Sequence, residues 1–208
     1  MGFKPKEREY RSIIEINAIE NDDEKKEKRV SGYACTFNDA YTLMEFDDEE
    51  YREQIDSHAF DDCNMDDVIM QYDHEGRVFA RTKNNTLSLS TDEHGLKIDA
   101  DLGGTEIGRN LYEEIRGGYT DKMSFGFVVA DDEWKEFIEG NKHIWIRTIK
   151  RISKLYDVSA VSIPANDATS ISVRNLCDGE ISKIKAERLS QKKLEISQAI
   201  IKAKIKAM

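Results

Sequence analysis

A serine at position 124 lies where its hydroxyl could act as a nucleophile. In Met123–Val129 every second residue is large and apolar, which predicts a strand with one face in the core. Ser124 and Gly126 share the other face, and we expect the glycine to let a peptide approach the hydroxyl. The segment is not GxSxG, so the nucleophile elbow of α/β-hydrolases does not apply. A catalytic serine also needs a base within hydrogen-bond reach and a group that orients this base.

Histidine and aspartate residues elsewhere in the chain could supply these two partners. Of the four histidines, His74 stands where an expected strand runs into the turn Asp73–Gly76, which leaves an imidazole edge accessible. A single histidine at a turn is more often incidental than catalytic. Asp157 shares a strand face with Leu155 and Val161, where a carboxylate costs several kcal/mol unless it is paired. An imidazole N–H, an arginine or a tyrosine hydroxyl could each be its partner, and the pattern does not choose among them.

The elements that must position these residues are mostly short strands. The helix Glu106–Arg116 has apolar residues at the spacing of one buried face, and the pair Gly117–Gly118 ends it. Asp39–Asp62 is polar and acidic, which predicts a loop with a short helix near Ser57–Phe60. We expect strands at 9–19, 29–37 with a bulge at Gly32, 67–72, 78–82, 86–91, 96–102, 123–130, 143–149 and 152–163, with a charged turn at 21–26 and an acidic turn at 131–133. The fold class is mainly β with helices (α+β): a small closed or partly open β-barrel with an internal helix.

The last 29 residues differ in composition from the rest. Residues 181–208 lack Gly and Pro and are rich in Lys, Ala, Glu and Ile, which predicts a helix. We therefore divide the chain into a domain at 1–179 and a helical C-terminal extension at 180–208. The extension carries eight basic and three acidic residues, so its net charge is +5. Because the whole chain has a net charge of −10, residues 1–179 have a net charge of −15.

Composition excludes several functional classes. The acidic charge of residues 1–179 argues against nucleic acid as their ligand. No apolar run approaches the roughly 18 residues of a membrane helix. Three widely spaced cysteines form neither a disulfide framework nor a CxxC zinc pattern, and no HExxH motif is present. A metallohydrolase that uses His58, His74 and His94 is therefore disfavoured, and we expect no cofactor and no metal.

Six short motifs together resemble the prohead (capsid maturation) serine protease family of tailed bacteriophages, which is related in fold to the herpesvirus assemblins. They span about Ser31 to Ser172 and occur in the order of the family: Gly32-Tyr33-Ala34, Ser57-His58-Ala59-Phe60, the turn at His74, Gly95-Leu96, Gly118 to Phe127, and Asp157-Val158-Ser159 leading to Pro164-Ala165-Asn166. One departure is His58, because the family often has Gly-Ala-Phe where this chain has His-Ala-Phe.

This resemblance implies roles for three residues. Ser124 would be the nucleophile, His74 its general base, and Asp157 the residue that orients the base. The assemblins use a second histidine as third member, which leaves His143 as the rival to Asp157. Backbone N–H groups would stabilise the oxyanion, and we expect them near Pro164–Asp167.

The resemblance also implies the biological setting. The substrates would be the scaffold or the major capsid protein, cut inside the assembling prohead in the host cytoplasm, together with the chain itself. A homodimer, or low local concentration before assembly, could restrain the activity. The extension at 180–208 would be a targeting or self-processed segment. The alternative is a non-catalytic, β-rich structural or scaffolding component of the same particle.

Overall fold

The computed structural model describes residues 8–19, 28–46, 48–162 and 170–206. The chain divides into two compact units, Met1–Thr169 and Ser170–Met208. The first unit holds all ten strands and one of the two α-helices found in the described residues, and the second is a single helix. The prediction of a mainly β protein with helices is therefore confirmed.

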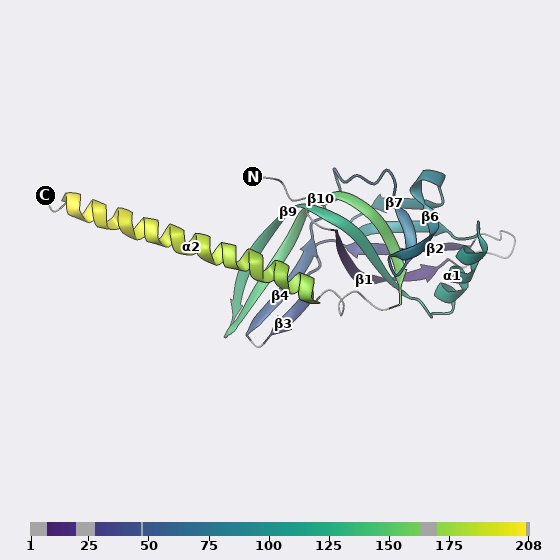
Figure 1. The fold of residues 1–208 in the computed structure, drawn as a ribbon, viewed down its shortest axis with the longest axis horizontal. Coiled ribbons are helices and arrows are strands. Elements are labelled where there is room, and N and C mark those ends of the chain that lie inside the picture. Colours follow the sequence, from purple (N-terminus) through teal and green to yellow (C-terminus); the bar gives the residue numbers. More distant parts are fainter. Residues whose placement is uncertain (1–7, 20–27, 47, 163–169, 207–208) are drawn as a thin grey trace. The chain divides into compact units, whose positions relative to one another are not determined.

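A long hairpin of two strands forms the spine of the first unit. Strands β9 (Lys122–Glu139) and β10 (Lys142–Val161) pair antiparallel along their whole length, and Gly140 with φ of 61° lies in the turn between them. The first half of β10 also pairs parallel with β4 (Glu49–Ile55), and its second half with β5 (Ile69–Tyr72). Figure 1 shows the two spine strands as long curved ribbons side by side.

The remaining strands extend the sheet from this spine. The main path runs β3-β4-β10-β9-β1-β2-β8-β7, and β6 is attached through β5. Their bounds are β1 Glu9–Ala18, β2 Arg29–Thr36, β3 Tyr41–Phe46, β6 Glu75–Arg81, β7 Leu87–Thr91 and β8 Gly95–Asp101, with a 3-10 turn, η1, at Thr82–Asn84. No pairing between the end strands β3 and β7 is present among the described residues, so the closed form of the predicted barrel is not observed.

Helix α1 (Glu106–Arg116) has the bounds that the sequence predicts. The hydroxyl of Thr105 accepts a hydrogen bond from the backbone N–H of Gly108 at 3.1 Å, which caps the first turn. Leu111 and Ile115 are buried, as expected for one apolar face. Gly118 follows the helix with φ of 72°, a conformation that favours glycine at a helix end.

The region 39–62 is the largest error of the sequence-based prediction. It contains strands β3 and β4 in place of a loop, and residues 57–62 form turns in place of a short helix. Acidic residues suggested solvent exposure, yet Glu53 has no exposed surface. Its carboxylate is buried because arginine side chains from two other strands neutralise it, and such distant partners leave no signal in the local sequence.

Three smaller predictions are also wrong. The acidic segment 131–133 continues strand β9, and the two strands expected at 143–149 and 152–163 are one strand, β10, with register shifts between Ile149 and Lys154. The bulge in β2 falls between Tyr33 and Cys35 and not at Gly32. Pairing along the whole β9–β10 hairpin overrides the local polar pattern, because each strand satisfies the backbone hydrogen bonds of the other. The turn predicted at 21–26 lies outside the described residues.

Helix α2 (Ser170–Lys206) forms the second unit. It contains the predicted helix up to Lys206 but begins at Ser170, and Gly179 lies within it. Leu189, Leu194, Ile196 and Ile201 are each more than half exposed. No helix in the described part of the chain is long and apolar enough to span a membrane.

Candidate active site

Ser124 lies near the start of β9, between β1 and β10. Its register partner in β10 is Ser159, and two residues further along Gly126 pairs with Asp157. Met123, Phe125 and Phe127 on the alternate positions are fully buried, which confirms the predicted core face. Ser124 itself has no exposed surface. The strand therefore fixes the serine firmly, with its neighbours anchored in the core.

His74 is held in a two-residue turn between β5 and β6. Tyr72 and Glu75 are register partners, so Asp73 and His74 form the whole loop. Their φ angles are 49° and 60°, and two successive positive φ angles are the signature of a type I′ hairpin turn. Aspartate suits the first position of this turn, but a histidine takes the second position, where glycine is preferred, so the turn is strained at His74 unless tertiary contacts hold it.

The side chain of Asp73 supplies these contacts. One of its carboxylate oxygens accepts a hydrogen bond from the backbone N–H of Ser162 and the other from the Ser162 hydroxyl, both at 2.8 Å. The backbone N–H of Asp73 donates to the carbonyl of Ala160 at 2.9 Å. Three hydrogen bonds thus tie the histidine turn to the end of β10 and fix the place of the imidazole.

The imidazole of His74 bridges Ser124 and Asp157. Its Nε2 lies 2.6 Å from Ser124 Oγ, and its Nδ1 lies 2.5 Å from Asp157 Oδ1. An ionised carboxylate only accepts, so Nδ1 carries the proton and Nε2 is free to accept from the serine hydroxyl. The structure thus brings together the three residues that the sequence analysis singled out, in the arrangement of a nucleophile, a base and an orienting acid.

The carboxylate of Asp157 is buried, and its two oxygens differ in their hydrogen bonds. Oδ1 accepts from His74 and also from the hydroxyl of Ser159 at 2.9 Å. Oδ2 accepts no hydrogen bond from any described residue and lies over Gly126, where an added Cβ would be 2.4 Å away. Glycine at 126 is therefore required by the aspartate. The prediction that it leaves room for a peptide is wrong, because the carboxylate of Asp157 and the ring of Tyr10 already occupy that space.

The outer side of the imidazole meets an aromatic ring, and a shallow pocket lies beside the turn that carries the imidazole. The Tyr10 ring, from β1, lies with its centroid 4.4 Å from that of His74. The His74 side chain is 15% exposed and is the accessible member of the three. Beside its turn lies a shallow pocket of about 420 Å³ lined by Tyr72, Asp73, Glu75, Gly76, Arg77, Phe79 and Ile107. Aromatic and aliphatic side chains form much of that lining, which suits an apolar side chain.

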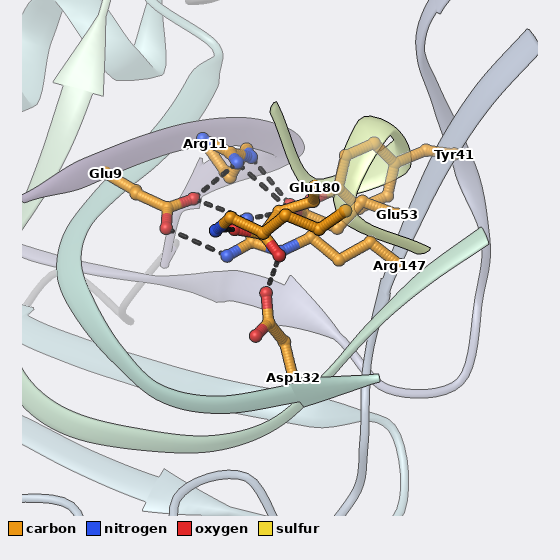
Figure 2. Close-up of polar contacts among 8 residues, drawn as sticks. Glu9, Arg11, Tyr41, Glu53, Asp132, Arg147 and Glu180 are labelled. Carbon is orange, nitrogen blue, oxygen red and sulfur yellow. Dashed lines mark hydrogen bonds and ion pairs between the residues drawn. The ribbon is translucent and has the colours of Figure 1, made fainter. Parts of the chain in front are cut away.

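A second polar cluster, which we call the ionic cluster, is formed by Glu9, Arg11, Tyr41, Glu53, Asp132 and Arg147 (Figure 2). Arg11 donates to both oxygens of Glu53, at 2.6 and 3.0 Å. Arg147 donates to Glu53 at 2.9 Å and to Asp132 at 2.7 Å, and it also contacts Glu9 through two hydrogen bonds. These are bidentate and charge-assisted bonds, the strong kind in proteins.

The cluster fixes the charge states of its members. Burial alone would raise the pKa of Glu53, but the charges of Arg11 and Arg147 outweigh burial and lower this pKa to about 2. Burial and the charge of Glu53 raise the pKa of Tyr41 well above its ordinary value, so its hydroxyl remains a donor to Glu53. At neutral pH Glu53, Arg11 and Arg147 are therefore charged, whereas Tyr41 is neutral.

The other histidines lie apart from Ser124. His143, the rival third member, contacts Glu136 through Nδ1 at 2.9 Å near the start of β10, whereas Asp157 lies near its end. His58 contacts Asp61, and His94 packs on the ring of Tyr33. Among the described residues no group of three or more His, Cys, Asp or Glu side chains could hold a metal ion. The oxyanion donors expected at Pro164–Asp167 lie outside the described residues.

A comparison with protein families identifies the chain. The model of the caudovirus prohead serine protease family matches residues 14–183. The chain belongs to this family. The prohead protease is thus a serine peptidase of capsid maturation, as the resemblance implied, and its matched region contains His74, Ser124 and Asp157. The chain has no significant match among curated proteins or among solved structures.

Several residues around the site of the prohead protease escaped the sequence analysis. Ser159 could have been found, because it lies two residues from Asp157 on the same strand face. Asp73 carried a weaker signal, since an Asp-His pair between two strand-like segments is compatible with a two-residue hairpin loop. Tyr10 carried none, because only the pairing of β1 with β9 brings its ring to His74.

Proposed function

We propose that Ser124, His74 and Asp157 form the catalytic triad of this prohead protease. The observation that carries the proposal is the imidazole of His74, with one nitrogen 2.6 Å from the serine hydroxyl and the other 2.5 Å from the buried carboxylate. Both distances suit proton transfer and orientation without any change of the turn. The three residues come from different elements, so their meeting is not a consequence of sequence proximity.

The mechanism is acyl transfer. His74 Nε2 takes the proton of Ser124 as Oγ attacks the peptide carbonyl, and the imidazolium then gives this proton to the leaving amine. Asp157 stays ionised and stabilises the imidazolium through Nδ1–H. A water activated by the same imidazole hydrolyses the acyl-enzyme. Backbone N–H groups would stabilise the negative charge on the carbonyl oxygen during both steps.

The substrate has to gain access to a covered nucleophile. Because Ser124 has no exposed surface, a scissile carbonyl reaches Oγ only after a local rearrangement. The pocket beside the histidine turn is a suitable site for an apolar substrate side chain. Phe79→Ala should therefore raise KM for cleavage with little change in kcat, since the residue does not contact the reacting atoms.

The substrates we propose are the scaffold protein or the scaffold-like part of the major capsid protein, and the protease itself. The test is mass spectrometry of the purified chain on standing, alone and mixed with the capsid and scaffold proteins of its own phage. New termini should form with the wild type and should be absent with Ser124→Ala. Ser153→Ala is a matched control, because Ser153 is an exposed serine of β10 whose hydroxyl donates to the carbonyl of Val128. Cleavage by the Ser124→Ala chain would refute the proposal.

For the extension at 180–208 we propose a targeting role. Its exposed apolar residues recur at intervals of seven, at Leu189 and Ile196 and at Leu194 and Ile201, which suits a partner helix. Deletion of residues 180–208 should leave peptide cleavage intact and abolish incorporation of the protease into proheads. Normal incorporation of the shortened chain, measured by the protein content of purified proheads, would contradict this role.

A further inference from the structure

The buried oxygen of Asp157 that faces away from His74 lacks a hydrogen-bonding partner. Asp157 is 1% exposed, and its Oδ2 receives no hydrogen bond from the described residues. A buried oxygen without a hydrogen bond is unfavourable, and more so in a charged group than in a neutral one. A positive charge close to Oδ2 would compensate for the missing hydrogen bond.

Arg8 provides the nearest compensating charge. Its Nη1 lies 3.6 Å from Asp157 Oδ2, beyond hydrogen-bond length but within the range of an ion pair. The described residues bring three polar or charged groups to this carboxylate: the imidazole of His74, the hydroxyl of Ser159 and the guanidinium of Arg8. Only Arg8 is permanently cationic.

Two tyrosines hold the guanidinium of Arg8 in this place. Its Cζ lies 3.8 Å from the ring centroid of Tyr156, on β10, which is the close approach of a cation–π contact. Nη1 donates to the hydroxyl of Tyr10 at 3.3 Å. Lys154 shares the ring of Tyr156, with its Nζ 4.5 Å from the centroid. Arg8 is therefore positioned by the strands on both sides of Ser124 even though its side chain is 37% exposed.

The register of β1 is what delivers Arg8 to the site. Side chains alternate along a strand, so Arg8 and Tyr10 reach the catalytic side while Glu9 and Arg11 reach the ionic cluster. The hydrogen bonds of Glu9 and Arg11 with Arg147 and Glu53 oppose any slip of the strand by one residue, which would exchange the two sets. Arg8 and Tyr10 precede residues 14–183, the part that matches the family.

We propose that Arg8 is a positioning residue for catalysis: its charge compensates the buried Oδ2 of Asp157 and keeps this carboxylate aimed at His74. This inference rests on the proposed triad and extends it to a residue before strand β1. The contacts of Arg8 with the described residues include Asp157 but not Ser124, so we infer that it acts through Asp157. A lysine at this position retains the charge and should retain most of the effect, whereas a glutamine should not.

The test compares Arg8→Gln with Arg8→Lys in the full chain, with cleavage of the capsid or scaffold protein as readout. Arg8→Gln should lower kcat about tenfold, equivalent to about 1.4 kcal/mol, with KM unchanged. Arg8→Lys should keep kcat within about threefold of the wild type, because lysine retains a positive charge near Asp157. Arg116→Gln is the control, since it removes the same charge from the exposed end of α1.

A spectroscopic readout separates positioning from a general loss of structure. In protein labelled with ¹⁵N-histidine, the low-field proton resonance of His74 Nδ1–H, assigned by its absence in His74→Gln, should shift or broaden in Arg8→Gln and persist in Arg8→Lys. An unchanged resonance and unchanged kcat in Arg8→Gln would overturn the role of Arg8. If Asp157→Asn is also without effect, the triad itself fails; if Asp157→Asn is strongly impaired, only the inference about Arg8 fails.

Discussion

The two polar clusters that meet strand β1 differ in how completely their charges are satisfied. In the ionic cluster the side chains of Arg11 and Arg147 are at most 5% exposed, and both oxygens of Glu53 accept hydrogen bonds from them. In the proposed triad of Ser124, His74 and Asp157, which we call the catalytic cluster, one oxygen of Asp157 has no hydrogen bond from the described residues. His74 is partly exposed, in a turn where its own φ is positive. Both clusters contain a buried carboxylate, but only in the ionic cluster do both of its oxygens accept hydrogen bonds from the described residues.

This difference indicates a division of roles. The ionic cluster joins five strands, β1, β3, β4, β9 and β10, and is costly to break, but its charged groups are already engaged with one another. The catalytic cluster retains an imidazole nitrogen that can accept a proton and a carboxylate with one oxygen that accepts no hydrogen bond from the described residues. Substitutions in the ionic cluster should therefore affect stability first, and substitutions in the catalytic cluster should affect activity first.

The largest effect is expected from the catalytic residues themselves. Ser124→Ala or His74→Ala should reduce turnover by a factor on the order of 10⁴–10⁶, because the two side chains act as one unit. For Ser124→Ala the midpoint of urea unfolding should change little, since this substitution removes no partner from the ionic cluster and leaves the bond between His74 and Asp157 in place. If Ser124→Ala also lost much of its stability, the claim that the two clusters have separate roles would be contradicted.

The converse substitution is Glu53→Gln. It leaves the cations of Arg11 and Arg147 without their shared anion, so the free energy of unfolding should fall by about 3 kcal/mol. The folded fraction should still cleave the substrate. Glu113→Gln is the control: it breaks exposed ion pairs with Lys28 and Arg116 and should cost less than about 1 kcal/mol. Equal effects of the two substitutions would show that the ionic cluster carries no special stability.

Gly126→Ala tests how closely the catalytic cluster is packed. The new methyl group would lie 2.4 Å from Asp157 Oδ2 and 2.8 Å from Tyr10 Cε1, so the carboxylate must move. A displacement of about 1 Å in such a site lowers kcat by roughly 10²-fold. Gly104→Ala is the matched control, because nothing lies within 4 Å of its added methyl group. Full activity of Gly126→Ala would mean that the position of Asp157 is not critical.

The smallest effect is expected on stability, when the pH is lowered and Glu53 takes up a proton. The pKa of Glu53 is lowered from 4.5 to about 2 in the folded chain, so the unfolded state binds the proton more readily. The stability that this group contributes is fully present above about pH 4.5 and is lost as the pH falls from there towards 2. Urea unfolding of the wild type should show this loss, with a slope of at most about 1.4 kcal/mol per pH unit. A chain with Glu53→Gln should show a smaller slope, and an equal slope would contradict the assignment.

The local sequence predicts elements whose pattern decides their structure. Helix α1 and the strand that carries Ser124 follow from the spacing of apolar residues, and Asp157 was noticeable as a carboxylate on an apolar face. Strands β3 and β4 were missed because Glu53 is neutralised by Arg11 and Arg147, which lie 42 and 94 positions away in the sequence. Arg8 and Tyr10 were missed for the same reason, since strand pairing and not sequence proximity brings them to the site.

The most direct test of the account is to find which residue becomes covalently modified during catalysis. A preparation that cleaves the capsid or scaffold protein is treated with a fluorophosphonate, and the adduct is mapped by peptide mass spectrometry. We expect a single adduct on Ser124, formed far more slowly in His74→Gln. An adduct on another serine, or modification of Ser124 at the same rate without the imidazole, would contradict the claim that His74 activates Ser124.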